Sequence, residues 1–517
     1  MAKVVPDPDA IAVIDFGGQY AHLIGRRIRE LGVYSEVITF DKAPEILRSI
    51  PNLKGIIFSG GPSSIYEADS PKIDKNIYSI GLPVLGICYG HQLIASQFGG
   101  VVSKGESKEY GRTLLDVVKP NLLLYSVKVR TTVWMSHGDQ VTNLPQGFVE
   151  LAKTGNARYA AFSDPTGKIY GVQFHPEVVH TVEGKKILRN FLYKICGCKP
   201  NWKPSSFIKQ ALDGITANYD GSKVICAVSG GLDSTVTAVL VKKVVKDNLV
   251  CVFVNNGLLR KDEPEAVINS LEQLGLNPIY VDASETFLNR LEGTVNPEEK
   301  RKIVGETFIE VFNDVAKKQG PFKYLAQGTL YPDVIESAKA GGPAATIKTH
   351  HNVGGLPSEL SYHLIEPLRS LYKDEVRKVA TILGLPYSIV KRHPFPGPGL
   401  CVRVIGGVTK EKLRICREAS AIVEEELKTS GIYDKIWQAF AYVGDDRAVA
   451  VLGDSRLYGY IVTIKVVTSK DGMTADWVKL PSKILDKMSA RITNEVKNVS
   501  SISYCISSKP PATIEPQ

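Results

Sequence analysis

Short apolar runs alternate with amphipathic stretches through the first part of the chain. Apolar residues recur with a helical period of about 3.6 at residues 21–31 and 91–98. Runs expected to form buried strands lie at residues 11–16, 55–59, 84–88 and 169–174. Because buried strands separated by helices are typical of a parallel sheet, this pattern predicts an α/β domain.

A second series of apolar runs follows a polar break. Residues 199–206 contain two prolines and several polar residues, which indicates a linker between domains. Beyond it, strands are expected near residues 223–228, 249–254, 278–282 and 323–327, with helical stretches between them. We therefore expect one α/β domain over residues 10–198 and a second over residues 207–399.

The last part of the chain has a different pattern. The segment Arg-His-Pro-Phe-Pro-Gly-Pro-Gly-Leu at 392–400 suits neither helix nor strand. An amphipathic helix is expected at 410–427, and strands are expected at 447–452, 458–468 and 501–506. The predicted fold class is therefore α/β: two parallel-sheet domains, followed by a smaller α+β domain over residues 400–517.

Composition narrows the classes of function. The 517 residues are 44% hydrophobic and 23% charged, with a net charge of +9 and only short Lys/Arg clusters, so we expect no nucleic-acid partner. No apolar run approaches the ~18 residues of a membrane span, and the first residues do not resemble a signal peptide. The eight cysteines have no regular spacing, which argues against a disulfide framework. These features favour a cytoplasmic protein.

A glycine-rich turn joins an expected strand to an expected helix in the second domain. Free N–H groups at a helix start, together with the helix dipole, make an anion site, and glycine lets the backbone approach phosphate closely. The spacing differs from that of a Walker A loop, and a capped glycine turn is the structural alternative. The turn resembles the pyrophosphate loop of N-type ATP pyrophosphatases, so its residues are candidate ATP ligands: Ser229, Gly230, Gly231, Leu232, Asp233, Ser234 and Thr235.

A candidate nucleophile lies in the first domain. The sequence Gly-Ile-Cys-Tyr-Gly at 86–90 has the form of a nucleophile elbow, which would expose Cys88 at a helix start where the dipole favours thiolate. The motif Gln-Phe-His-Pro-Glu at 173–177 offers a base, His175, and a carboxylate to orient it, Glu177. A cysteine or histidine considered alone is more often a packing residue. Together, these motifs predict a catalytic site.

This set of motifs closely resembles class I glutamine amidotransferases, which release ammonia from glutamine through a thioester. The resemblance implies that the backbone N–H groups of Gly60 and Tyr89 form the oxyanion hole. It also implies that five residues hold the glutamine substrate: Gln92, Ser136, His137, Gly138 and Asp139.

An ammonia source joined to an ATP pyrophosphatase implies an amination in which a carbonyl oxygen is adenylated and is then displaced by ammonia. Longer motifs at 327–337, 348–356, 392–400 and 509–515 resemble the family of glutamine-hydrolysing GMP synthases. The resemblance extends from about residue 10 to residue 515. It implies XMP, ATP and glutamine as substrates, with Mg²⁺ accompanying the ATP. A homodimer is also expected from this resemblance.

The same resemblance assigns residues to the second site. Asp233 and Asp333 suit Mg²⁺, which prefers carboxylate and phosphate oxygens. Further candidate ATP ligands are Asn256, Gln327, Gly328 and Lys348, and residues 336–347 suggest a lid over the ATP site. The candidate XMP ligands are Arg301, Gly399, Gln438, Lys509, Ile514 and Glu515.

The chain departs from the family pattern at two places. Asn255 stands where the family more often has Asp, and residues 516–517 are Pro-Gln instead of Trp-Glu.

Two alternative functions stay open at this point. One alternative keeps the pyrophosphatase but changes the acceptor, as in an NAD synthetase or a tRNA-modifying ligase. The other is a non-catalytic nucleotide or glutamine sensor, which would be expected to lack Cys88, His175 or Asp233.

Overall fold

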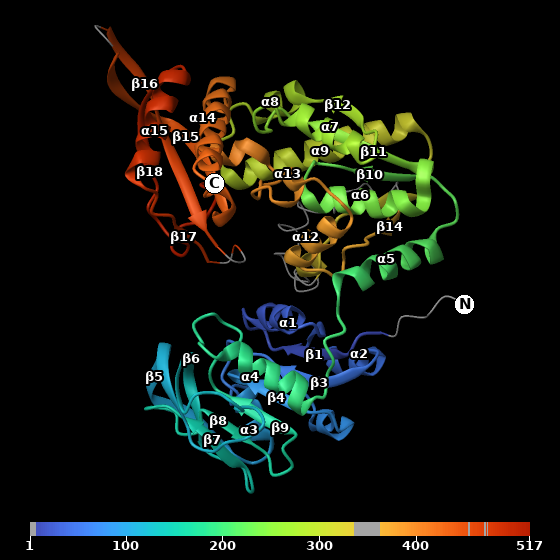
Figure 1. Ribbon diagram of the computed structural model, residues 1–517, viewed down its shortest axis with the longest axis vertical. Coiled ribbons are helices and arrows are strands. Elements are labelled where there is room, and N and C mark those ends of the chain that lie inside the picture. The colour runs from blue at the N-terminus through green and yellow to red at the C-terminus, as the bar shows by residue number, and fades with distance from the viewer. Residues whose placement is uncertain (1–6, 335–361, 453–454, 470–471, 473) are drawn as a thin grey trace. The chain divides into compact units, whose positions relative to one another are not determined.

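The computed structural model describes residues 7–334, 362–452, 455–469, 472 and 474–517. The chain divides into two compact units, Met1–Ser206 and Phe207–Gln517, and each is described by itself. Figure 1 labels their elements. Two expectations, Lys348 as an ATP ligand and a lid at 336–347, lie outside the described residues.

One nine-stranded sheet forms the centre of the first unit, with strand order β2-β1-β3-β4-β9-β8-β7-β5-β6. The first five strands are parallel, as predicted, and the others pair antiparallel. The antiparallel part was not predicted, because its long strands alternate between buried and exposed residues instead of forming apolar runs. In strand order, the bounds are Tyr34–Thr39, Ala10–Asp15, Leu53–Phe58, Val84–Ile87, Ile169–Val172, Ala161–Ser163, Val149–Lys153, Val101–Val117 and Arg130–Asn143.

Helices accompany the parallel part of this sheet. They are α1 (Ala21–Glu30), α2 (Ala43–Ile46), α3 (Tyr89–Gln97) and α4 (Gly184–Asn190). Every residue of β1 and β4 is buried, which explains why these strands read as continuous apolar runs. Helix α3 follows β4 directly, so the helix start lies at the carboxyl end of the sheet.

The segment expected to be a free linker is attached to the first unit over part of its length. The backbone N–H of Trp202 donates to the carbonyl of Gly32 (2.9 Å), and its ring centroid lies 5.0 Å from that of Tyr34. The backbone N–H of Lys199 donates to the carboxylate of Asp9 (2.7 Å). The expected linker therefore begins as part of the first unit and ends inside helix α5 (Pro204–Asn218).

The second unit contains a five-stranded parallel sheet with order β12-β11-β10-β13-β14. In this order the strands span Ile279–Asp282, Leu249–Asn255, Val224–Ala227, Tyr324–Ala326 and His363–Ile365. Short β14 was not predicted. The accompanying helices are α6 (Leu232–Val245), α7 (Glu263–Gln273), α8 (Ser284–Leu291), α9 (Pro297–Gln319), α12 (Lys373–Ile382) and α13 (Tyr387–Val390). Central β10 leads directly into the glycine turn.

The last part of the chain packs on this sheet through a shared core. Strands β15 (Gln438–Leu452) and β16 (Ser455–Thr468) form a long antiparallel ribbon, extended by β17 (Asp476–Trp477) and by parallel β18 (Val499–Tyr504). Helices α14 (Lys410–Thr429) and α15 (Ser482–Glu495) pack on one another. One hydrophobic cluster joins Ile225 and Val252 to Val443 and Ile464. A domain boundary at 399/400 stays a prediction.

None of the helices in the described parts of the chain combines the length and the apolar character needed to span a bilayer.

Candidate active sites

The turn after β4 holds Cys88 in a conformation that few residues adopt. Its φ is 54° and its ψ is −105°, outside the main allowed regions. The flanking glycines permit this turn, because a Cβ on Gly86 would lie 2.4 Å from the carbonyl oxygen of Gly90, and one on Gly90 would lie 2.5 Å from Phe58 Cβ. The predicted elbow geometry is therefore present, and Cys88 precedes the first residue of α3.

The candidate base, His175, and its carboxylate, Glu177, lie just after the neighbouring strand β9. Strand β9 pairs in parallel with β4, with Ile87 opposite Val172, so the segment after β9 emerges beside the cysteine turn. His175 lies within hydrogen-bonding reach of the thiol of Cys88. Its Nδ1 lies 2.7 Å from Oε1 of Glu177, and both side chains are buried. The structure thus brings together all three predicted catalytic side chains.

Charge and burial act in opposite directions on His175. Burial lowers the pKa of the imidazole, but the Glu177 carboxylate and the contact with Cys88 outweigh it and raise the pKa to about 10. The imidazole is therefore positively charged at neutral pH. A charged imidazole next to the thiol stabilises a thiolate and can give a proton to a departing amine.

Gly60 lies directly beside the thiol and the imidazole. A Cβ built on Gly60 would lie 3.3 Å from His175 Cε1 and 3.7 Å from Cys88 Cβ. The Ser59 hydroxyl holds the start of this loop by accepting from the N–H of Phe16 (3.1 Å). Tyr89 is the first residue of α3, where the N–H has no partner within the helix. These positions suit the predicted oxyanion role, which remains a prediction.

The predicted glutamine-binding residues cluster next to the cysteine. The side-chain amide of Gln92 donates to the carbonyl of Asp139 (2.8 Å) and to Oε1 of Gln173 (3.2 Å). The carbonyl of Ser136 lies 3.7 Å from Cys88 Sγ. Gln173 was missed by the sequence reasoning, although its amide lies 3.8 Å from the same sulfur and it stands two residues before the candidate base.

A buried polar group supports the strand that carries these residues. His137 Nε2 lies 3.1 Å from the carboxylate of Glu109, and Nδ1 lies 2.9 Å from the carbonyl of Asp139. The Thr154 hydroxyl also donates to Glu109 (3.0 Å). Burial raises the pKa of Glu109, but these hydrogen bonds outweigh it and lower the pKa. Glu109 was missed because it lies in β5, which the apolar pattern did not reveal. The predicted ligand Gly138 lies next to Lys108 of the same strand β5.

The glycine turn of the second unit has the form expected of a phosphate loop. Gly230 has a φ of 70°, and its Cβ would lie 2.2 Å from Val267 Cγ2. Gly231 caps α6, and its N–H points to the hydroxyl of Ser229 (3.3 Å). The Ser234 hydroxyl lies 3.2 Å from the same oxygen, so donors converge inside the turn. The adjacent Leu232 and Thr235 are buried.

Asp233 lies at the start of α6, facing the end of β13. One carboxylate oxygen forms an ion pair with Lys373 of α12, and the other is buried with no hydrogen-bond partner among the described residues. Gln327 and Gly328 follow β13, and a Cβ on Gly328 would lie 3.2 Å from Asp233 Cβ, so the backbone here lies close to Asp233. A carboxylate oxygen beside a phosphate loop fits Mg²⁺, which usually takes one or two carboxylates plus phosphate and water.

The second predicted metal ligand has a structural contact. The carboxylate of Asp333 accepts from the backbone N–H of Leu330 (2.8 Å). Within the described ranges there is no group of three or more His, Cys, Asp or Glu residues that could hold a metal without substrate oxygens. Joint magnesium binding by Asp233 and Asp333 therefore remains a prediction.

The two asparagines after β11 shape the turn that they enter. The side-chain oxygen of Asn255 accepts from the N–H of Gly257 (3.0 Å), and that of Asn256 accepts from the N–H of Leu258 (2.9 Å). An Asp at 255 could accept the same bond. The departure from the family pattern thus retains the acceptor that shapes this turn.

Two predicted XMP ligands meet at a buried arginine that was not predicted. Arg403 donates two hydrogen bonds of 2.9 Å to the carboxylate of Glu515, and Gln438 donates to the same carboxylate (2.5 Å). The guanidinium also lies over the Phe440 ring (4.0 Å). Gln438 begins β15 and is buried. Ile514 is next to this group in the chain.

The other predicted XMP ligands with described contacts have different partners. Arg301 of α9 donates to the carbonyl oxygen of Gln517 (2.7 Å), and Lys509 donates to that of Gly472 (2.9 Å). Gly399 packs against Leu258, where a Cβ would lie 2.5 Å from a carbonyl oxygen. The XMP assignment therefore remains a prediction for all six residues.

Comparisons with known proteins match each part of the chain. Residues 12–195 match the model of class-I glutamine amidotransferases, residues 205–308 match that of NAD synthase, and residues 425–516 match the GMP synthase C terminal domain. The fold and sites thus define a class I glutamine amidotransferase joined to an ATP pyrophosphatase.

Proteins named GMP synthase [glutamine-hydrolyzing] match nearly the whole chain. The protein of Carboxydothermus hydrogenoformans is 53% identical over 98% of this chain and 99% of its own length. That of Pyrobaculum aerophilum is 52% identical, covering 98% and 100%. The crystal structure of a GMP synthase subunit from Thermoplasma acidophilum is 35% identical over 37% of this chain and 95% of that chain, with a TM-score of 0.31. The chain belongs to the glutamine-hydrolysing GMP synthase family.

Replacing Glu177 with Gln tests whether this carboxylate keeps the His175 imidazole charged beside the Cys88 thiol. The native imidazole should stay charged until the pH approaches about 10, whereas without Glu177 only the contact with Cys88 opposes the effect of burial, so the pKa should fall toward the ordinary value of 6.5. Glutaminase activity should fall on the order of 10²–10⁴-fold between these pH values, and less below them. Rates of glutamate release from about pH 5.5 to pH 10.5 measure this. A native-to-variant ratio that is independent of pH would contradict the assignment.

Proposed function

We propose that this chain makes GMP by ATP-dependent amination of XMP, with nitrogen taken from glutamine. XMP, ATP, glutamine and water give GMP, AMP, pyrophosphate and glutamate. One observation carries the proposal: a thiol–imidazole–carboxylate set and a glycine phosphate loop occur on one chain that resembles GMP synthases over 98% of its length.

Glutamine hydrolysis is assigned to the first unit. The sulfur of Cys88 attacks the carbonyl carbon of the glutamine side chain, and the N–H groups of Gly60 and Tyr89 hold the resulting oxyanion. His175, charged beside Glu177, gives its proton to the departing nitrogen. Neutral His175 then takes a proton from water, which attacks the thioester to release glutamate and restore the thiol.

Substrate positioning in this step is assigned to the cluster beside the sulfur. The carbonyl of Ser136 lies 3.7 Å from Cys88 Sγ, and the amide of Gln92 donates to the carbonyl of Asp139 (2.8 Å). His137, anchored by buried Glu109, contacts the same carbonyl and supports Gly138 and Asp139 within β6. Hydrogen-bonding groups on fixed strands suit a substrate that carries its own amide, carboxylate and ammonium groups.

Adenylation is assigned to the second unit. The xanthine oxygen attacks the α-phosphorus of ATP and displaces pyrophosphate, and ammonia then displaces AMP from the resulting adenyl-XMP. The N–H and hydroxyl groups of Ser229–Thr235 face the leaving pyrophosphate. Mg²⁺, held by Asp233 with Asp333 as the second predicted carboxylate, would neutralise phosphate charge. XMP is assigned to the group formed by Gln438, Glu515 and their neighbours.

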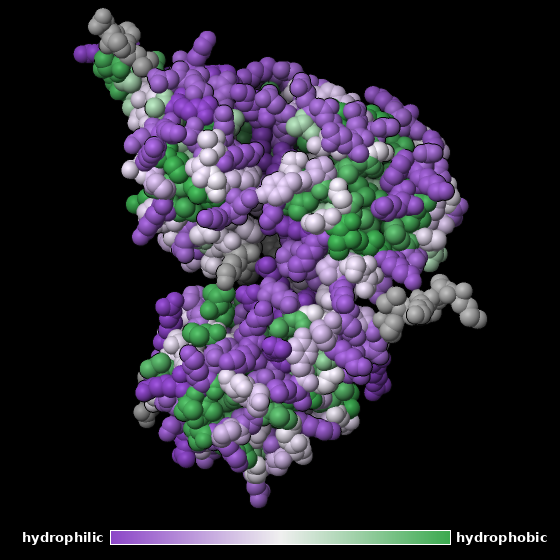
Figure 2. Space-filling model, in the orientation of Figure 1, coloured by the Kyte–Doolittle hydropathy of each residue, from purple (hydrophilic) through white to green (hydrophobic). Residues whose placement is uncertain are grey.

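Pairing of two copies through the β15–β16 ribbon completes the proposal. Val449 and Tyr458 are directly opposite across the strands, and they and Val451 are 64–72% exposed. Figure 2 shows hydrophobic residues gathered at the outer part of this ribbon. Exposed apolar side chains on an edge strand favour association with another chain, and a second copy presents the same face.

Changing Cys88 to Ala separates the two nitrogen sources. Synthesis with glutamine should fall to background, because no thioester can form, while synthesis with an ammonium salt should stay within about twofold of native. Loss of XMP absorbance reports both, and it also distinguishes this function from the use of another acceptor and from a non-catalytic sensor. Cys505→Ala is the matched control and should change neither rate. Loss of the ammonia-dependent rate in Cys88→Ala would refute the division of labour.

Changing Asp233 to Asn removes the carboxylate beside the phosphate loop. Synthesis should fall at least about 100-fold with either nitrogen source, because metal and phosphate lose their charged partner. Asp247→Asn is the control, since that side chain is fully exposed in the same unit. Unchanged synthesis in Asp233→Asn would show that the glycine turn is not the ATP site.

Changing Val451 to Asp places a charge on the exposed face of the ribbon. The variant should sediment as a monomer at concentrations at which the native chain sediments as a dimer, because pairing would bury the new charge. Val295→Asp, at a position that is 59% exposed elsewhere in the unit, should leave the native mass unchanged. A native monomer would refute this pairing.

A further inference from the structure

An open pocket lies beside the phosphate loop of the second unit. The pocket has a volume of about 760 Å³ and is lined by Gly230 and Thr235 together with residues from α7, α13 and α14. Close packing therefore does not support Gly230 from this side, apart from its contact with Val267. A loop that must hold N–H groups in fixed positions needs another support here.

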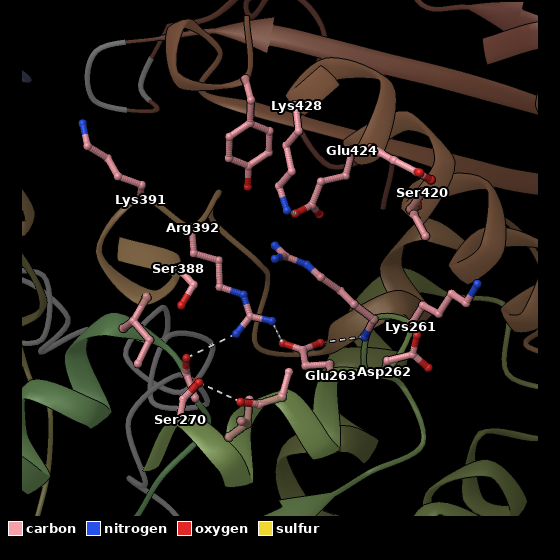
Figure 3. Close-up of a pocket in the computed structure, with 18 of the residues that line it drawn as sticks. Lys261, Asp262, Glu263, Ser270, Ser388, Lys391, Arg392, Ser420, Glu424 and Lys428 are labelled. Atoms are coloured by element: carbon pink, nitrogen blue, oxygen red, sulfur yellow. Dashed lines mark hydrogen bonds and ion pairs between the residues drawn. The ribbon is translucent and has the colours of Figure 1, made fainter. Parts of the chain in front are cut away.

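A partly buried ion pair lines this pocket and reaches the loop. Arg392, from the segment before Pro394, forms an ion pair with Glu263, the first residue of α7, and also donates to the carbonyl oxygen of Gly230 (3.3 Å). Figure 3 shows Arg392 and Glu263 pointing toward one another across the pocket. One side chain thus links a segment more than 160 positions away in the sequence to the loop backbone.

Glu263 is itself held in place. Its second oxygen accepts from the backbone N–H of Arg260 (2.6 Å), and its side chain is 4% exposed. The guanidinium of Arg260 donates to the carbonyls of His393 and Pro394 (2.9 and 3.3 Å), so the segment that carries Arg392 is tied to the same turn. Glu263 is therefore the carboxylate that compensates two neighbouring arginines.

The contact with Gly230 determines where the next N–H points. The carbonyl of Gly230 and the N–H of Gly231 belong to one planar trans peptide, so the two groups point in opposite directions. Because Arg392 holds the carbonyl toward the pocket, the N–H of Gly231 points into the loop, where it meets the Ser229 hydroxyl (3.3 Å). Gly230, at a φ of 70°, has no side chain to enforce this orientation.

We propose that Arg392 and Glu263 are positioning residues for the phosphate loop, acting through the Gly230 peptide on the binding of the ATP phosphates. This inference rests on the proposed ATP role of the loop. Neither residue is assigned to touch substrate. Their effect should appear in the use of ATP and leave the use of XMP little changed.

The test compares R392Q, E263Q and the double variant R392Q/E263Q in ammonia-dependent synthesis. R392Q should raise KM for ATP about tenfold or more, with KM for XMP within about twofold, because misplacing a phosphate donor by about 1 Å is costly. E263Q should have a similar effect and should also lower the unfolding temperature, since it removes the buried carboxylate that pairs with Arg392 and accepts from the N–H of Arg260. The double variant should recover the unfolding temperature but keep the raised KM for ATP.

A merely structural role predicts a different outcome. The double variant would then restore KM for ATP along with stability, and this result, or an unchanged KM in R392Q, would overturn the proposal. If the glutamine variants lose folded structure, R392K provides the test. Lysine keeps the positive charge but lacks the planar guanidinium that contacts the Glu263 carboxylate and the Gly230 carbonyl together. R392K should raise KM for ATP; a native value would overturn the proposal.

Matched controls separate failure of this inference from failure of the proposed function. The exposed pair Lys410–Glu285 (2.8 Å) lies in the same unit, and K410Q/E285Q should leave both KM values unchanged. If Asp233→Asn abolishes synthesis while R392Q keeps a native KM for ATP, only the positioning role fails. If Asp233→Asn leaves synthesis intact, the ATP assignment of the loop itself fails.

Discussion

The close approach of neighbouring groups to glycine backbone is the constraint on which both candidate sites depend. The turn at Cys88 is possible because residues 86 and 90 are glycines. A Cβ on Gly86 or Gly90 would lie only 2.4–2.5 Å from a neighbouring atom. In the second unit, Gly230 takes a positive φ against Val267, and Gly328 lies against Asp233. In both places a strand runs into a helix start, so the tight turn aims a reactive group or N–H donors at the carboxyl edge of a parallel sheet.

The two sites use buried charge differently. In the first unit, one oxygen of Glu177 contacts the buried imidazole of His175, and the other is buried with no hydrogen-bond partner in the described structure. In the second, Asp233 shares one oxygen with Lys373 and also keeps the other without such a partner. The difference lies in the surroundings: a carboxylate beside a buried imidazole keeps that ring charged through a covalent cycle, whereas a carboxylate oxygen beside a phosphate loop suits a metal that arrives with its nucleotide.

Local motifs predicted the strand-to-helix turns well, and residues brought together by distant pairing were predicted poorly. The apolar runs located β1, β3, β4, β10 and β11, because strands buried on both faces carry continuous apolar sequence. The antiparallel strands β5 and β6 alternate between buried and exposed positions and were not found. Glu109 of β5 was missed with them. Gln173 was missed although it begins the motif at 173–177, because only the folded structure shows its amide beside the sulfur of Cys88.

The sequence by itself determined the chemistry available at each turn: a cysteine between glycines, a histidine two residues before a glutamate, and a run of glycine and hydroxyl residues after a strand. These features are local, and local backbone geometry follows from residue type. Only the tertiary structure decided that His175 meets Cys88, that Arg403 gathers Gln438 and Glu515, and that Arg392 reaches Gly230. Those contacts join positions far apart in the chain, and packing and sheet register, not residue type, place them.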